Sequence, residues 1–164
     1  METQKLVQQM AEGLSAAQLE FRPEGGRWSV AENLEHITVV EQRIVKGLER
    51  TLQGPADMTK RAALTDEEVA QKVDTVTEPL LAPEAVRPGS RWPSAELLKE
   101  FDATRQRTME FAAALGGKDL RHHFMPHPYF GDLDGYQWLI VIASHAVRHC
   151  RQCEAVKACA GYPR

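Results

Sequence analysis

The chain has 164 residues, of which 43% are hydrophobic and 26% are charged, and its formal net charge at pH 7 is −3. This balance is typical of a globular protein with a hydrophobic core, so we expect residues 1–164 to form one domain. A net negative charge gives no electrostatic case for nucleic-acid binding, which requires a strongly basic face. The longest apolar run, residues 138–143, is too short to cross a membrane. The N-terminus lacks the apolar core of a signal peptide, so we predict a cytoplasmic protein without a membrane partner.

Four segments carry apolar residues at alternating spacings of three and four, which predicts four helices. The first covers roughly residues 3–21 and ends before Pro23 and the Gly25-Gly26 pair. The second begins at Ser29, where Ser29 and Glu32 form a capping box, and stops at Gly54-Pro55. The third begins near Ser94 and closes at Gly116-Gly117, and the fourth begins at Asp132 or Asp134 and ends before Gly161.

A long connection, residues 54–92, separates the second and third predicted helices. Thr65 and Glu68 form another capping box within it, so we expect one short helix there. One long connection among short ones predicts an all-α four-helix bundle that is not simply up-down-up-down. No run of alternating apolar residues predicts a strand, and the stretch from Arg121 to Asp132, with its prolines and glycine, is typical of a loop.

Two of the six histidines, His145 and His149, stand four residues apart in the fourth predicted helix. Residues at this spacing share one face of a helix, so the two imidazoles can chelate one metal ion. Ala146 stands where a zinc-protease helix carries its glutamate base, which excludes that class of enzyme. Catalytic metal sites usually have three protein ligands, and His36 in the second helix is the candidate for the third.

Other interpretations of these histidines stay open. His122, His123 and His127 are alternative ligands, but they lie in the predicted loop. A histidine pair at this spacing also arises by chance, and His36 can be a core histidine with a hydrogen-bond partner. Glu32 lies one turn before His36 and can either orient that imidazole or complete the capping box with Ser29, which we favour.

Three cysteines, Cys150, Cys153 and Cys159, lie in the last fifteen residues. An odd number in one cluster does not form a disulfide framework. Cys150 and Cys153 have the spacing of a redox motif, but no strand precedes them as it does in thioredoxin-like proteins. We therefore expect reduced cysteines that are not metal ligands, with Cys150 and Cys153 on a buried helix face.

The two histidine-bearing helices resemble those of the DinB-like (YfiT-type) superfamily of bacterial four-helix proteins. The resemblance covers the segments RWSVAENLEHITVVEQRI and HPYFGDLDGYQWLIVIASHAVRHCRQCEAV, in the second and fourth predicted helices and the loop before the fourth. The matching residues are Trp28, Ser29, His36, His127, Pro128, Gly131, His145, Arg148, His149 and Gln152. The similarity runs along nearly the whole chain, including the long second connection.

The resemblance implies an up-down-down-up bundle that often forms homodimers. It also implies a divalent metal ion held by His36, His145 and His149, and imidazole ligands suit zinc or nickel. Relatives with known reactions transfer or isomerise small molecules with a low-molecular-weight thiol. We therefore predict metal-thiolate attack on an electrophilic small molecule. The alternatives are hydrolysis by metal-bound hydroxide and a non-catalytic metal- or ligand-binding stress protein.

Two further predictions concern partners. The run from Trp138 to Ala143 is apolar on all sides of the predicted helix, so more than one face needs a partner, which favours a homodimer. Arg148 and Gln152 can contact an anionic substrate, or they can form a solvated or dimer-facing edge. The sequence predicts a pocket beside the metal if the protein is an enzyme, and a closed site if the metal is structural.

Overall fold

A computed structural model describes residues 2–75 and 81–164 of the chain. The helices are α1 (Glu2–Ala11), α2 (Ala16–Glu20), α3 (Val30–Thr51), α4 (Asp66–Thr75), α5 (Leu97–Ala114) and α6 (Gly135–Lys157). Two 3-10 turns, η1 (Glu84–Val86) and η2 (Ser94–Glu96), precede α5, and strands β1 (Phe124–His127) and β2 (Gly131–Asp134) precede α6. The predicted all-α bundle is confirmed, although the described residues form six helices and one small hairpin instead of four helices.

Capping boxes define where α3, α4 and α6 begin. Ser29 caps α3, with Glu32 returning a bond to the Ser29 amide, and Thr65 and Glu68 do the same for α4. Asp134 caps α6 through the backbone amide of Gln137. Each box satisfies backbone groups that a helix start leaves unpaired, and the two predicted from sequence are both present.

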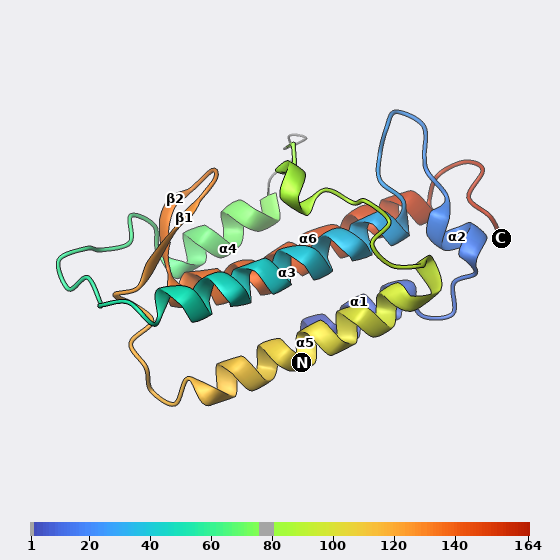
Figure 1. Cartoon of the computed structure of the whole chain (residues 1–164). Helices are drawn as coiled ribbons and strands as arrows, with labels where there is room; N and C mark the ends of the chain where they lie inside the picture. The colour runs from blue at the N-terminus through green and yellow to red at the C-terminus, as the bar shows by residue number, and fades with distance from the viewer. Residues whose placement is uncertain (1, 76–80) are drawn as a thin grey trace.

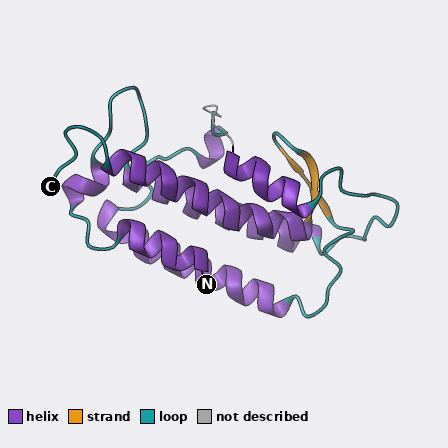
Figure 2. Ribbon diagram, turned by 180° about the vertical axis from the view of Figure 1, so that it is seen from behind, coloured by secondary structure: helices purple, strands orange, loops and turns teal. Residues whose placement is uncertain are grey.

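The long helices lie side by side with the order up-down-down-up (Figure 1). α3 and α5 run in one direction, whereas α1 and α6 run in the opposite direction. α3 packs against both α5 and α6, and α1 packs against α6 and α5. α4, from the long connection, packs along α6, as the view from behind also shows (Figure 2). Among the described residues no helix is both long and apolar enough to span a bilayer.

The prediction of one continuous helix over roughly residues 3–21 was wrong, because this segment forms two helices. The chain leaves the helical conformation after Ala11, and Gly13 takes a left-handed backbone conformation with φ of 76°. Ser15 then caps α2 through its own capping box with Gln18. The apolar spacing continues across the break because α1 and α2 face the same core, so periodicity alone did not reveal it.

The absence of strands was also a wrong prediction. β1 and β2 form an antiparallel hairpin in which Phe124 pairs with Asp134 and His127 pairs with Gly131. Gly131 has a φ of 76°, which glycine adopts without strain. Each strand has four residues and β1 contains Pro126, so neither shows the alternation by which a strand is recognised.

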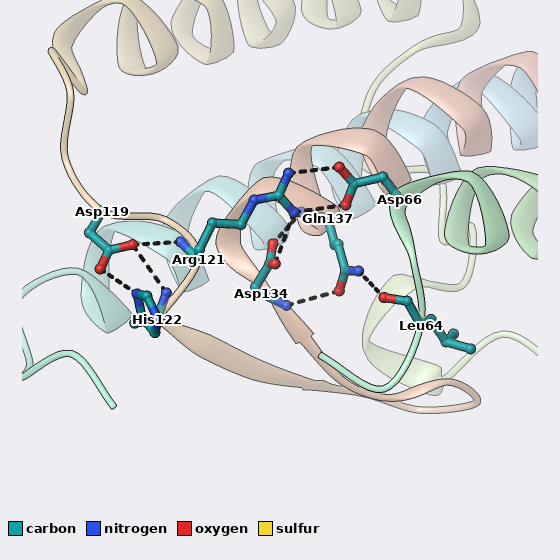
Figure 3. A network of polar contacts seen from close by, with 7 residues as sticks. All are labelled: Leu64, Asp66, Asp119, Arg121, His122, Asp134 and Gln137. Carbon is teal, nitrogen blue, oxygen red and sulfur yellow. Dashed lines mark hydrogen bonds and ion pairs between the residues drawn. The ribbon is translucent and has the colours of Figure 1, made fainter. Parts of the chain in front are cut away.

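A polar network holds the hairpin and α4 against the start of α6 (Figure 3). Arg121 donates to Asp66 at 2.7 Å and to the capping residue Asp134 at 3.0 Å. The Gln137 side chain donates to the Leu64 carbonyl at 2.6 Å. Three segments that are distant in sequence are therefore fixed at one end of α6, and this arrangement shapes one end of the cavity described below.

The buried side chains form two clusters along the bundle. One gathers residues of α1, α2, the first half of α3, α5 and the second half of α6. The other gathers the second half of α3, α4, β2 and the first half of α6. His36 on α3 and His145 on α6 occupy the level at which the two clusters meet, because Ile37 and Ala146 belong to the first and Ile44 and Ile142 to the second.

Candidate metal centre

Three predicted ligands converge between α3 and α6. The Nε2 atom of His145 lies 3.2 Å from Nε2 of His36 and 3.1 Å from Nε2 of His149. The ligating nitrogens of all three residues lie within 4.8 Å of one another. His36 and His149 are buried, and His145 is partly exposed. The i, i+4 spacing on α6 and the antiparallel packing of α3 bring these side chains to one point.

Hydrogen bonds set which ring nitrogen faces that point. His36 Nδ1 donates to the Val86 carbonyl oxygen at 2.7 Å. His149 Nδ1 donates to Oδ1 of Asn33 at 2.8 Å, and the Asn33 amide is itself held by a bond from Nδ2 to the Ser29 carbonyl at 2.9 Å. A neutral imidazole that donates from Nδ1 has its lone pair on Nε2. Both residues therefore present a metal-binding lone pair to the shared point.

Coordination of one divalent cation suits the three imidazoles better than hydrogen bonds among the rings do. A proton on His145 Nε2 can satisfy only one of its two nitrogen neighbours, which leaves lone pairs facing each other. Nitrogens about 2.0–2.1 Å from one tetrahedral ion lie about 3.2–3.4 Å apart, close to the separations found here. The donor set is therefore suited to zinc or a similar transition metal, and the three histidines can hold such an ion.

Electrostatics keep these ligands neutral. Burial lowers the pKa of His36, and the positive charge of Arg148 adds to this effect while the bond to Val86 opposes it. Burial lowers the pKa of His145 and of His149 well below the usual value, and the neighbouring imidazoles and Arg148 contribute in the same direction. Neutral imidazole is the form that binds metal, so ligands do not have to lose protons near pH 7.

An aromatic wall closes one side of the centre. The Trp28 ring lies 4.9 Å, centroid to centroid, from His36 and stacks on His149 at 6.2 Å with an interplanar angle of 18°. Trp28 immediately precedes the cap of α3, so the capping box also fixes the wall. The indole limits the orientations of both rings.

A cavity of about 1160 Å³ opens beside the three histidines, and all three line it. This volume is large enough for a small organic molecule. Towards the hairpin the wall is apolar and includes Ile44, Met125, Phe130, Trp138 and Val141. In the opposite direction along α6 the wall includes the polar side chains of Arg148 and Gln152 and the apolar ones of Ala155 and Val156.

Charge is distributed unevenly around this cavity. Within the described part of the chain, the wall contains five arginines and no aspartate, glutamate or lysine. The arginines are Arg27, Arg43, Arg50, Arg87 and Arg148. Arg148 is the member closest in sequence to the metal ligands, because it lies on α6 directly before His149.

The other predicted residues have different roles. Glu32 accepts from the Ser29 amide and from Arg22, so its carboxylate completes the capping box and does not orient His36. His122 bonds to Asp119, and His123 bonds to the carbonyls of Asp119 and Gly54. Both lie outside the three-histidine cluster.

His127 was predicted to lie in a loop, and this prediction was wrong. It ends β1, lines the cavity and stacks on Phe130 with centroids 4.3 Å apart and an interplanar angle of 2°. The backbone amide of Tyr129 donates to His127 Nδ1 at 3.2 Å. The proton of the neutral ring therefore lies on Nε2. The His-Pro dipeptide was noted in the sequence, but nothing in it indicated a hairpin that points into the cavity.

The cysteines do not join the cluster. Cys150 and Cys153 are free and buried in the first hydrophobic cluster, and Cys159 is free and partly buried. Burial raises the pKa of the Cys150 thiol to about 11 and that of Cys153 further. Protonated thiols in an apolar environment behave as small hydrophobic groups, as the sequence predicted.

Comparisons with known proteins agree with this geometry. A family model described as the DinB superfamily matches residues 2–153, a span that includes all three histidines. A relative described as the uncharacterized protein YuaE of Bacillus subtilis (strain 168) is 30% identical over 147 residues, which cover 88% of this chain and 86% of the relative.

Proposed function

The chain belongs to the DinB superfamily, and we propose that it binds one divalent transition-metal ion, zinc or nickel, through His36, His145 and His149. The observation that carries this proposal is the convergence of three Nε2 atoms. Hydrogen bonds among the three rings cannot satisfy all of their lone pairs at once. Zinc and nickel both accept three imidazoles, and the open cavity leaves room for a further ligand.

We favour an enzyme over a structural metal protein because the site is not closed. A structural zinc site has four protein ligands, whereas only three candidate ligands meet here within the described residues. The neighbouring cavity gives a small molecule access to the same point. A metal- or ligand-binding protein without turnover is the alternative, and because a ligand-binding protein would use the same cavity, a turnover assay distinguishes the two.

The reaction that we propose is transfer of a low-molecular-weight thiol to an electrophilic small molecule. A divalent ion at this site would lower the pKa of a coordinated thiol so that its sulfur is anionic near neutral pH. The thiol proton would pass to solvent, the sulfur would form the bond to the electrophilic carbon, and the electron pair of the broken bond would leave with the displaced group. Hydrolysis by activated water is the second reading, but the cavity wall offers no carboxylate as a general base among the described residues.

Residues of the chain prepare the site for this reaction. Asn33 and the Val86 carbonyl hold the His149 and His36 rings with Nε2 towards the cavity. Trp28 packs against the same two rings and limits their orientations. The apolar wall towards the hairpin gives the body of a substrate a dry surface, which strengthens the electrostatic interactions around the reacting atoms.

The test is metal stoichiometry by mass spectrometry on protein purified without a histidine tag. We expect about one equivalent in the wild type and in His122→Ala, and losses of orders of magnitude in affinity for His36→Ala and His145→Ala. Full occupancy in His36→Ala, or loss in His122→Ala, would overturn the ligand assignment. The reaction is then screened with cysteine and coenzyme A as thiols and monochlorobimane as electrophile, against an ester-hydrolysis arm. Turnover only in the hydrolysis arm would replace the transferase by the hydrolase.

A homodimer and a cytoplasmic location stay predictions. The apolar run of α6 already packs against other parts of the same chain. α4 and α3 contact this helix, and Trp138 is only 8% exposed. The family resemblance therefore supports the dimer more than the apolar run from Trp138 to Ala143 does. Light scattering at micromolar concentration tests it, and a stable monomer would contradict it.

A further inference from the structure

The basic wall of the cavity contrasts with the acidic balance of the chain. The sequence has 23 acidic and 20 basic residues, yet the described part of the wall carries five arginines and no carboxylate. Ion pairs elsewhere in the described chain use other arginines, such as Arg105 with Glu41 and Arg151 with Asp74. None of the five cavity arginines forms an ion pair with a described residue. Their positive charge is therefore not neutralised by a carboxylate of the described chain, and it contributes a positive potential at the cavity.

Arg148 is the cavity arginine with the least access to water. Arg27, Arg43, Arg50 and Arg87 are exposed around the cavity, whereas Arg148 is half-buried between the two ligands of α6. Its Nε atom is buried and has no hydrogen-bond partner among the described residues. A buried guanidinium donor without an acceptor is costly, because a charged group loses its hydration and gains nothing in return. A bound anion would supply the missing acceptor.

The position of Arg148 also defines the rest of the ligand. The apolar part of the wall, with Trp138 and Val141 on α6 and Ile44 on α3, lies on the hairpin side of the three histidines. Arg148 and Val141 are seven residues apart, or about 10 Å along the helix axis. A ligand that reaches from one to the other passes His145 on the way, since that residue lies between them on α6.

From this arrangement we infer that the cavity takes an organic acid, with a carboxylate or sulfonate on Arg148 and an apolar body against Ile44, Trp138 and Val141. The acid group accepts from the guanidinium, and the exposed arginines at the rim attract the anion before it enters. The inference rests on the proposed function in one respect, because it takes the metal centre as the place where the middle of the ligand reacts. The acid subsite itself is tested by binding alone.

The experiment is calorimetric titration with naphthalene-2-carboxylate and with its neutral analogue naphthalene-2-carboxamide. We expect the wild type to bind the carboxylate about tenfold or more tightly than the amide. Arg148→Gln should weaken carboxylate binding by about ten- to a hundredfold and leave the amide unchanged. Arg148→Lys should keep a preference for the carboxylate. The matched control is Arg151→Gln, three residues further on the same helix and paired with Asp74 outside the cavity wall, which should bind as the wild type does.

Each titration is repeated after metal removal with EDTA, so that binding to the ion is separated from binding to Arg148. Equal affinity for acid and amide in the wild type, absence of measurable binding, or equal affinity in Arg148→Gln and Arg151→Gln would overturn the inference. A carboxylate preference that survives Arg148→Gln but disappears with EDTA would assign the anion to the metal alone. If circular dichroism shows that Arg148→Gln does not fold, the inference is tested by two other measurements. These are the acid and amide affinities of the wild type and the carboxylate preference of Arg148→Lys. A wild type that takes up no metal in the stoichiometry test but still shows the Arg148-dependent preference would refute the proposed function and leave the acid subsite standing.

Discussion

Asn33 connects the start of α3 to a ligand on α6. Its Oδ1 accepts from His149 Nδ1 at 2.8 Å, and its Nδ2 donates to the Ser29 carbonyl. The residue is buried, so no water can replace the bond easily. It therefore fixes both the orientation and the tautomer of His149 without touching the point at which the three Nε2 atoms meet.

Replacing Asn33 with alanine should weaken metal binding by about 10- to 100-fold, because His149 then loses the acceptor that holds its lone pair towards the cavity. Asn33→Asp keeps an acceptor at the same place. Its metal affinity should therefore be close to that of the wild type and no weaker than that of Asn33→Ala. Competition with a chromophoric chelator measures both affinities. An alanine variant that binds like the wild type would mean that packing alone orients His149.

Cys153 tests whether a thiol belongs to the ligand set, because it stands four residues after His149 on the same helix. Its side chain is fully buried in the first hydrophobic cluster, and its pKa is raised by burial, so the thiol stays protonated. Cys153→Ser should leave metal content unchanged while lowering the free energy of unfolding by about 1–3 kcal/mol, because a hydroxyl is placed among apolar groups. Metal analysis and urea unfolding give the two numbers. Loss of metal would show that the ligand set is wrong.

The sequence predicted which histidines converge better than it predicted the residues that orient them. His145 and His149 share a face by spacing alone, and His36 was selected because it lies beside the apolar stripe of a facing helix. Asn33 and Val86 could not be found in the same way. An asparagine inside a helix has many roles, and a backbone carbonyl from a 3-10 turn fifty residues away leaves no trace in residue type.

At the scale of elements, the hairpin brings His127 to the cavity wall. The ring stacks on Phe130 and lies 5.1 Å from the Trp138 ring, and burial lowers its pKa to about 4. The unfolded chain has an ordinary histidine pKa near 6.5. Between these values the unfolded chain takes up a proton at this residue and the folded chain does not, so the stabilising contribution is complete above about pH 6.5 and is lost as pH falls towards about 4.

The free energy of unfolding of metal-free protein should therefore fall less steeply between pH 6.5 and 4 in His127→Gln than in the wild type. The difference between the two profiles isolates His127 from the other buried histidines, whose pKa values are also lowered. Urea unfolding in EDTA at intervals of half a pH unit gives both profiles. Parallel profiles would mean that His127 is solvated and does not belong to the packed wall.

Helix starts were predictable where a local bond marks them, as at Ser29 and Thr65. The break after Ala11 and the hairpin were not, and the reasons are physical. α1 and α2 both face the core, so the helical spacing survives a turn that changes the chain direction. The hairpin is held by tertiary contacts, such as the bond from Trp138 Nε1 to the Met125 carbonyl at 3.2 Å, instead of by its own alternation.

For the whole molecule, the candidate centre lies where α3 and α6 bring the two hydrophobic clusters together. α3 carries one candidate ligand and α6 carries two, so an ion bound there would join helices that are about a hundred residues apart in sequence. Ligands at these positions exist as a set only in the folded chain. Metal binding must therefore stabilise the fold as a whole, in proportion to the ratio of free metal to the dissociation constant.

Adding zinc or nickel at about 100 times the dissociation constant should raise the free energy of unfolding by about 2.7 kcal/mol, which for a chain of this length is a rise in Tm of about 5–10 °C. His122→Ala should show the same rise as the wild type, because its side chain bonds only to Asp119 outside the cluster. His36→Ala should show almost none, since the remaining pair lies on one helix and no longer joins it to α3. Differential scanning calorimetry with and without metal measures these shifts. A rise in His36→Ala as large as in the wild type would place the stabilising ion elsewhere, and the link between α3 and α6 would then depend on packing alone.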